Sequence, residues 1–164
     1  MRRYLSIVVV ALLPAVAPVL AQEGTGGTIG GRATVVDAST VEIYGRSIRI
    51  YGIDTPERGG PGFGPAAEFM RRAAERGPFI CDVVDDAADD VAGENGSGQD
   101  TAVCRVKDDF LSEDVAESLL ELGLAKTKPG QRHLRPNLIS WYEKVEAEAK
   151  ERCRGLWQEL PECE

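Results

Sequence analysis

The sequence predicts a small α+β domain: a five-stranded, partly open Greek-key β-barrel of the OB type with three helices. Short segments rich in β-branched and aromatic residues come first, with tight turns between them, and three helical patterns complete the chain. The chain has 164 residues, a length that fits one hydrophobic core and leaves no room for two. The domain is expected over residues 32–164.

Residues 1–21 are typical of a secretory signal peptide. Two arginines come before an apolar stretch, and small residues stand before the expected cleavage point. A membrane anchor is the alternative, but Pro14 and Pro18 interrupt the apolar stretch, which is shorter than the roughly 20 residues that a spanning helix needs. We therefore expect a secreted or periplasmic protein with no membrane span in the mature chain.

Residues 22–31 are rich in glycine and have no apolar period, so we expect a flexible lead into the domain. Cleavage removes Arg2 and Arg3 and no acidic residue, which takes the formal net charge from −8 to −10. The mature protein is therefore acidic. We expect it to be a monomer.

Three strands are predicted within residues 32–52, where β-branched and aromatic residues recur in short runs. Turns at residues 37–39 and 44–46 separate them. Two further strands are predicted at residues 78–84 and 101–107. The segment between these two carries acidic and small residues without an apolar period, so we expect a long mobile hairpin loop there.

Three amphipathic helices are predicted, over residues 65–77, 112–123 and 136–155. A proline suits the first turn of the first and third helices. Ser112 and Asp114 favour the start of the second helix, because their side chains can accept the unpaired N–H groups of its first turn. A glycine ends each helix.

The four cysteines lie in the mature part of the chain, at Cys81, Cys104, Cys153 and Cys163. An exported chain with an even number of cysteines usually pairs them, and three pairings are possible. A metal site would need clustered Cys or Cys/His spacing, which this sequence lacks. If the strands at residues 78–84 and 101–107 pair antiparallel, Cys81 and Cys104 lie opposite one another. We predict disulfides Cys81–Cys104 and Cys153–Cys163.

The run VVDASTVEIYGRSIRIYGIDTPE, residues 35–57, resembles the opening of the staphylococcal nuclease (thermonuclease) family. That family's pattern is V-x-D-G-D-T, a short hairpin, then R-L-x-G-I-D-T-P-E. FGPAAEFM resembles the family's first helix, AESLLELGLAK its second-helix segment, and residues 133–157 its last helix. The resemblance covers nearly all of residues 32–157 and implies an SNase-like domain.

The resemblance implies a calcium-dependent nuclease, a phosphodiester hydrolase that acts on DNA and RNA. Water attack on a phosphodiester builds negative charge on the phosphorus oxygens, so a cation, guanidinium groups and a carboxylate base are suited to the reaction. By the resemblance, Asp54 and the backbone oxygen of Thr55 match metal ligands. Arg49 matches the first phosphate arginine, and Glu57 matches the general base.

Two matched positions depart from the family pattern. Ser39 stands where the pattern has a second metal aspartate, and Gln99 stands where it has a second phosphate arginine. We therefore expect calcium binding to be weak or absent. Asp37 could supply a carboxylate only if its bend rearranges, and Asp100 has the wrong charge to bind phosphate.

The charge pattern favours the same interpretation, because seven acidic residues and no basic one lie from Asp82 to Asp100. His133 is expected to be a surface or helix-entry residue. Trp141 and Trp157 are expected to pack in the core and at a helix end. Three functions are compatible with these observations. The first is a pseudoenzyme, a weak or inactive nuclease that binds nucleic acid, another phosphate-bearing ligand or a protein partner. The others are an active calcium-dependent nuclease and a structural envelope protein. The first is favoured, because both departures remove groups that contact metal or phosphate.

Overall fold

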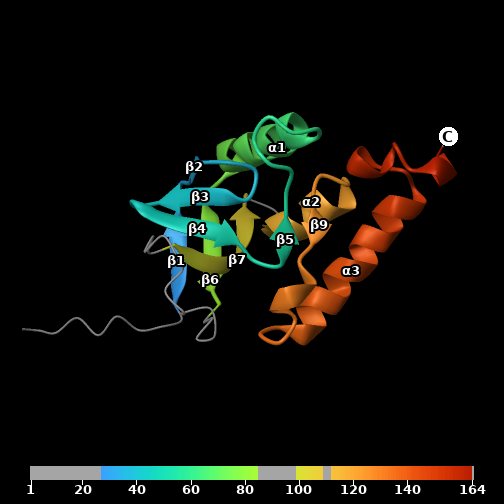
Figure 1. The fold of residues 1–164 in the computed structure, drawn as a ribbon. Coiled ribbons are helices and arrows are strands. Elements are labelled where there is room, and N and C mark those ends of the chain that lie inside the picture. The colour runs from blue at the N-terminus through green and yellow to red at the C-terminus, as the bar shows by residue number, and fades with distance from the viewer. Residues whose placement is uncertain (1–26, 85–98, 109–111, 164) are drawn as a thin grey trace, which may run out of the picture.

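The computed structural model describes residues 27–84, 99–108 and 112–163. The strands among these residues are β1 (Thr28–Gly31), β2 (Thr34–Val35), β3 (Thr40–Ile43), β4 (Arg46–Ile50), β5 (Ile53–Asp54), β6 (Phe79–Val83), β7 (Asp100–Lys107), β8 (Ser112–Asp114) and β9 (Lys126–Thr127). The helices are α1 (Phe63–Arg76), α2 (Val115–Glu121) and α3 (Pro136–Glu151), with short 3₁₀ turns η1 (Pro129–Gln131), η2 (Gly155–Trp157) and η3 (Pro161–Cys163). Figure 1 shows α1 above the larger sheet and α3 to its right.

The larger sheet has the strand order β1-β6-β7-β4-β3-β2, with β8 paired to β7, and β5 and β9 form a separate pair. All neighbours are antiparallel except β4 and β7, which are parallel. The sheet does not close, but its two ends, β1 and β2, are separated in the chain by Arg32 and Ala33 only. The predicted α+β fold is confirmed as an open, OB-like sheet with three helices, and the five predicted strands are β2, β3, β4, β6 and β7.

Strand β1 corrects the expectation of a flexible lead over residues 22–31. It pairs with β6, and Ile29 lies opposite Cys81. Gly31 lies close to Tyr44, since a Cβ on Gly31 would lie 2.9 Å from the Tyr44 ring. The described part of that segment is therefore mostly strand. The expected signal peptide, residues 22–26 and residues 85–98 of the acidic loop lie outside the described residues.

The three predicted helices are present, and the second and third are shorter than predicted. Ser112–Asp114 form β8, so α2 covers only Val115–Glu121. Helix α3 ends at Glu151, not at Gly155. Cys153 and Gly155 have φ values of 51° and 53°, which a continuing right-handed helix does not allow. Gly155 also packs on the backbone of Gly123, where a Cβ would lie 2.4 Å from the carbonyl oxygen of Gly123. The chain therefore leaves the helix early and forms η2.

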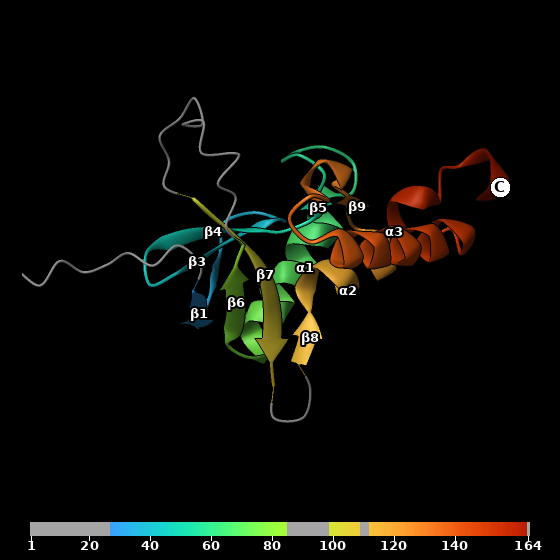
Figure 2. The same ribbon diagram turned by 90° about the horizontal axis from the view of Figure 1, so that it is seen from below.

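A partly buried polar pair joins α2 to α3, which lie side by side (Figure 2). The Tyr142 hydroxyl lies 3.0 Å from each carboxylate oxygen of Asp114, and Asp114 also accepts the N–H groups of Ala116 and Glu117. Burial raises the pKa of Asp114 despite these hydrogen bonds. Burial, and then the charge of Asp114, raise the pKa of Tyr142. The carboxylate thus serves as the predicted N-cap and as an inter-helix link.

The hydrophobic core lies between the sheet and the helices. Its largest fully buried side chains are Tyr51, Tyr142, Phe79, Ile43, Ile48, Ile50, Ile53, Met70, Leu119, Leu120, Ile139 and Val41. Among the described residues, no helix is long and apolar enough to cross a membrane.

Both predicted disulfides are confirmed. Cys81 on β6 pairs with Cys104 on β7, and the two residues are direct partners in the strand register. Cys153 pairs with Cys163, which ties the end of α3 to η3. The first bond lies in the core and the second closes the C-terminal segment around Trp157.

Candidate functional site

The turn between β2 and β3 holds Asp37 and Ser39. Oδ1 of Asp37 accepts the backbone N–H of Ser39 at 2.8 Å and the Ser39 hydroxyl at 3.2 Å. Ser39 is 5% exposed, and its carbonyl accepts the N–H of Ile50 at 2.8 Å. A carboxylate that bonds its own chain two residues on is an Asx turn. The Asp37 carboxylate therefore orders this turn, and position 39 supplies only a hydroxyl.

Arg49 and Asp54 meet across the turn that joins β4 to β5. Nη2 of Arg49 lies 3.3 Å from Oδ1 of Asp54, and the two side chains are 33% and 67% exposed. Gly52 reverses the chain between them with φ of 79°. A Cβ on Gly52 would lie 2.9 Å from both Ile139 and Tyr142. Helix α3 therefore packs directly under the turn that brings the arginine and the carboxylate together.

Thr55 and Glu57 follow β5 on a surface loop, where Thr55 is half-buried and Glu57 is exposed. The loop turns immediately after Glu57, because the N–H of Gly60 donates to the Glu57 carbonyl at 2.9 Å. Nη2 of Arg58 donates to the Val36 carbonyl at 3.2 Å. That bond ties the loop with Glu57 to the turn before β3.

Gln99 lies on the chain just before β7, at the same end of the sheet as Arg49. Its Nε2 donates to the Ser47 hydroxyl at 3.0 Å. Strands β4 and β7 are parallel, with Thr101 opposite Arg49. Asp100 pairs instead with Arg46, Nη2 to Oδ2 at 2.9 Å. Gln99 thus contacts β4 two residues before Arg49, and the Ser39 carbonyl accepts the N–H of Ile50, one residue after Arg49.

Of the two aspartates that the resemblance implies as metal ligands, Asp54 is present and Ser39 stands at the other position. Over residues 27–84, 99–108 and 112–163, no three His, Cys, Asp or Glu side chains are grouped so that they could hold a metal ion. Calcium takes about six to eight oxygen ligands, with carboxylates among them. Here the Asp54 carboxylate faces Arg49, and the hydroxyl of Ser39 donates a hydrogen bond to Asp37.

Lys126 lies beside the site, and the sequence did not predict this. It is the direct partner of Asp54 in the β5–β9 pair, and such partners project to the same face. Its Nζ lies 5.3 Å from the centroid of the Trp157 ring, and Nζ of Lys150 lies 4.4 Å from it. Strands as short as β5 and β9 carry no periodicity, so their pairing has no sequence signal.

The remaining predicted surface and packing residues differ in outcome. Trp157 is 7% exposed and packs after α3, as predicted. Trp141 is 45% exposed, and its ring lies 5.4 Å from Nζ of Lys144, so the prediction that it packs in the core is wrong. His133 is exposed, with Nδ1 3.2 Å from the carbonyl oxygen of Gly130.

Comparison with known protein families gives one finding. The model of a family described as Staphylococcal nuclease homologue matches residues 47–159, well over half of the chain. The match includes Arg49, Asp54, Glu57 and Gln99, and it begins after the turn that holds Ser39. A search of the curated proteins finds no match.

Proposed function

The chain belongs to the staphylococcal nuclease homologue family, and we propose that within it this protein binds a phosphate-bearing ligand with weak or no nuclease activity. The observation that carries the proposal is the Arg49–Asp54 pair at 3.3 Å, next to a position where Ser39 replaces a carboxylate. The arginine is kept, and the set of carboxylates for a metal is not. Calcium binding is accordingly proposed to be weak or absent.

Phosphate binding is supported by the exposure of the retained arginine. An exposed ion pair contributes only about 0–1 kcal/mol, so a phosphate can displace Asp54 from Arg49 at small cost. Guanidinium groups bind phosphate through two parallel hydrogen bonds. Lys126, the partner of Asp54 across β5–β9, adds positive charge nearby. The ligands that carry phosphate include nucleic acid, another phosphate-bearing molecule and a protein partner that carries phosphate.

Weak catalysis is proposed because two contributions to transition-state stabilisation are missing. Loss of one preorganised donor to the developing charge typically lowers the rate by ~10²–10³. Gln99 cannot donate a guanidinium fork, and it is held by the hydroxyl of Ser47. The absence of the second metal carboxylate lowers the rate further. Glu57 is exposed and able to orient an attacking water. Few groups are left to stabilise the negative charge that this attack would build on the phosphate oxygens.

An active calcium-dependent nuclease that hydrolyses DNA or RNA is the second candidate. It is favoured by the retention of Arg49, Asp54, Thr55 and Glu57 within the matched segment. The two candidates differ in one measurable property, calcium-dependent cleavage that requires Glu57.

The deciding experiment measures cleavage and binding on the same protein. Single-stranded DNA is incubated over a calcium titration with the unaltered protein and with Glu57→Gln. We expect no cleavage above that of Glu57→Gln. Binding of a non-cleavable phosphorothioate oligonucleotide is measured in parallel, with loss expected in Arg49→Ala. Efficient cleavage that Glu57→Gln abolishes would establish the second candidate.

The N-terminal pattern supports export of the protein to a secreted or periplasmic location, and the mature protein is proposed to be a monomer. N-terminal sequencing of protein recovered outside the cytoplasm tests this, with Gln22 expected as the first residue. Sedimentation velocity tests the proposed monomeric state. Recovery with residues 1–21 attached would contradict the proposed cleavage.

A further inference from the structure

Gln131 carries a buried amide next to the connection between β4 and β5. Its side chain is 7% exposed, and it ends the short turn η1 that lies between β9 and α3. Figure 1 shows this part of the chain beside the connection between β4 and β5. Polar side chains are seldom buried unless hydrogen bonds compensate for the loss of water. The partners of Gln131 therefore indicate its role.

Those partners are the two residues that connect β4 to β5. Oε1 of Gln131 accepts the N–H of Gly52 at 2.9 Å, and its backbone carbonyl accepts the Tyr51 hydroxyl at 2.6 Å. The carbonyl of Gly52 accepts the N–H of Lys128, also in this segment, at 2.8 Å. Gly52 and Tyr51 are both buried, so water does not replace these bonds.

The same bend is where the chain passes from the larger sheet to the smaller one. The N–H of Tyr51 donates to β7 of the larger sheet, at the carbonyl of Ala102, over 2.8 Å. Strand β5, which follows the bend, pairs with β9 instead. Arg49 therefore lies on the larger sheet and Asp54 on the smaller one. Their relative position is set at the bend that Gln131 holds.

We propose that Gln131 is a positioning residue of the candidate phosphate site, a role that rests on the proposed function. By holding the bend, it sets where the carboxylate of Asp54 lies relative to the guanidinium of Arg49, 3.3 Å away. The carboxylate orients the guanidinium before a ligand arrives, so less conformational freedom is lost when phosphate takes its place. Without the acceptor on Gln131, the N–H of Gly52 would be buried and unpaired, which favours a shift of the bend.

The test replaces Gln131 by Met, which has a similar length and no oxygen acceptor. The side-chain Nε–H signal of Arg49 in nuclear magnetic resonance spectra reports the surroundings of the guanidinium, and Asp54→Asn gives the reference for a guanidinium without its carboxylate. In Gln131→Met, the Arg49 signal should move toward its position in Asp54→Asn. Inorganic phosphate, titrated at constant ionic strength, should bind about five- to tenfold more weakly than to the parent.

Phe79→Leu is the control for lost stability. Phe79 is fully buried at the start of β6 and lies opposite Val106 on β7. Val106 is four residues along β7 from Ala102, which is roughly 13 Å. The substitution should therefore lower the unfolding free energy and leave the Arg49 signal and the phosphate affinity unchanged.

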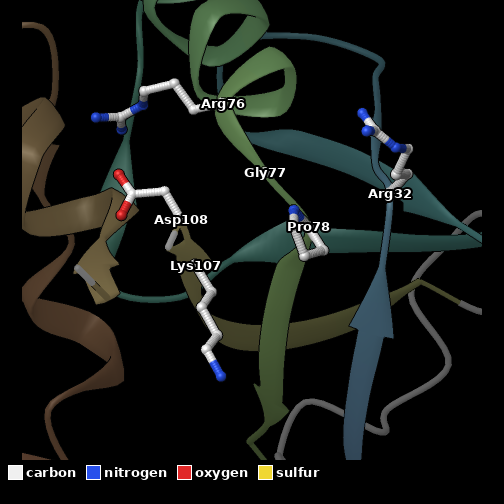
Figure 3. Close-up of a pocket in the computed structure, with 6 residues that line it drawn as sticks. All are labelled: Arg32, Arg76, Gly77, Pro78, Lys107 and Asp108. Carbon is white, nitrogen blue, oxygen red and sulfur yellow. The ribbon is translucent and has the colours of Figure 1, made fainter. Parts of the chain in front are cut away.

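Arg32→Ala/Lys107→Ala is the control for diffuse attraction of the anion. Figure 3 shows these two side chains beside the Gly77–Pro78 corner, with their charged ends pointing away from one another. They do not converge on one anion, so their removal should leave phosphate binding at Arg49 unchanged. An equal loss of affinity in this control and in Gln131→Met would overturn the proposal.

The remaining outcomes separate this role from the proposed function. A Gln131→Met variant that keeps the Arg49 signal and the phosphate affinity of the parent would overturn the role of Gln131, and so would equal changes in Phe79→Leu. If Gln131→Met does not fold, amide exchange in the unaltered protein decides, because rapid exchange of the Gly52 N–H would show that Gln131 does not hold it. If the unaltered protein binds no phosphate, the proposed function fails, and the Arg49 signal, which needs no phosphate, still decides whether Gln131 positions Arg49.

Discussion

The side chain of Gln99 is bonded to that of Ser47, which precedes Arg49 by two residues on β4. Side chains two residues apart on a strand project to the same face. The amide of Gln99 therefore lies on the face of the sheet that presents Arg49. An arginine at position 99 would therefore extend from the same face as Arg49, where it could donate to the same phosphate.

The variant Ser39→Asp/Gln99→Arg is expected to gain calcium-dependent nuclease activity. By the family resemblance, the change restores a carboxylate to the metal set that includes Asp54 and a second phosphate arginine, and both act on one transition state. Cleavage of single-stranded DNA should rise by roughly 10²-fold or more over the parent. The gain should exceed that of either single change, which a rate assay over a calcium titration measures.

Glu57→Gln in the same background is the control. It should remove the gain while leaving the fold intact, because Glu57 is exposed on a loop. A double variant that folds and stays inactive would show that the retained residues do not form a recoverable site. Equal rates in the double variant and the better single variant would contradict the expectation that both introduced groups stabilise one transition state.

Ser39→Asp alone is expected to lower thermal stability without calcium. Position 39 is 5% exposed, and the introduced charge would lie two residues from Asp37, so burial and like-charge repulsion both act against it. A loss of about 1–3 kcal/mol is expected. Added calcium should recover part of the loss in Ser39→Asp and have little effect on the parent. Thermal melts with calcium and with chelator measure this, and an equal calcium response in both proteins would contradict it.

Much of the fold could be predicted because its elements carry strong local signals. The hairpin before Arg49 shows β-branched alternation, and Asp114 stands at the start of α2 as its N-cap. Strand β1 could not be predicted, since Gly30 and Gly31 read as a linker. In the structure Gly31 is part of β1 and lies close to the ring of Tyr44. Glycine for close packing and glycine for flexibility look identical in a sequence.

The candidate site was predictable where residues are close in the sequence. Arg49, Asp54 and Glu57 lie within one short stretch, and the pairing of the first two is observed. The position of Lys126 depends on two strands of two residues each, which no periodicity reveals. The engagement of Asp37 in its own turn likewise depends on backbone geometry that residue types alone do not specify.

Gly62→Ala is expected to destabilise the protein and to weaken the loop that carries Glu57. Gly62 has φ of 81°, and a Cβ there would lie 2.3 Å from Cδ2 of Leu156. Both strain and overpacking contribute, about 1–3 kcal/mol together. Gly64→Ala is the matched control, because a Cβ on Gly64 meets nothing within 4 Å. Chemical denaturation should show the loss in Gly62→Ala only, and equal effects would contradict the contact with Leu156.

Thr28→Val is expected to lower the unfolding free energy near neutral pH and to change how that free energy depends on pH. Oδ1 of Asp82 accepts the Thr28 hydroxyl at 2.8 Å, and Oδ2 pairs with Arg105 at 3.0 Å. The hydrogen bond from Thr28, followed by that from Arg105, lowers the pKa of Asp82 below its ordinary value of 3.8, although burial opposes the shift. A lowered carboxyl pKa stabilises the fold above the unfolded value, and this contribution is lost as the pH falls below 3.8 through the folded value. Removing the hydroxyl should therefore raise the pKa of Asp82 in the folded protein, and the difference in unfolding free energy between Thr28→Val and the parent should shrink as the pH falls through that range.

Carboxyl chemical shifts of Asp82 and denaturation from pH 2 to pH 7 measure both effects. Thr34→Val, on β2, is the control and should leave the pKa of Asp82 unchanged; an unchanged Asp82 pKa in Thr28→Val would show that β1 does not contact β6 through this bond.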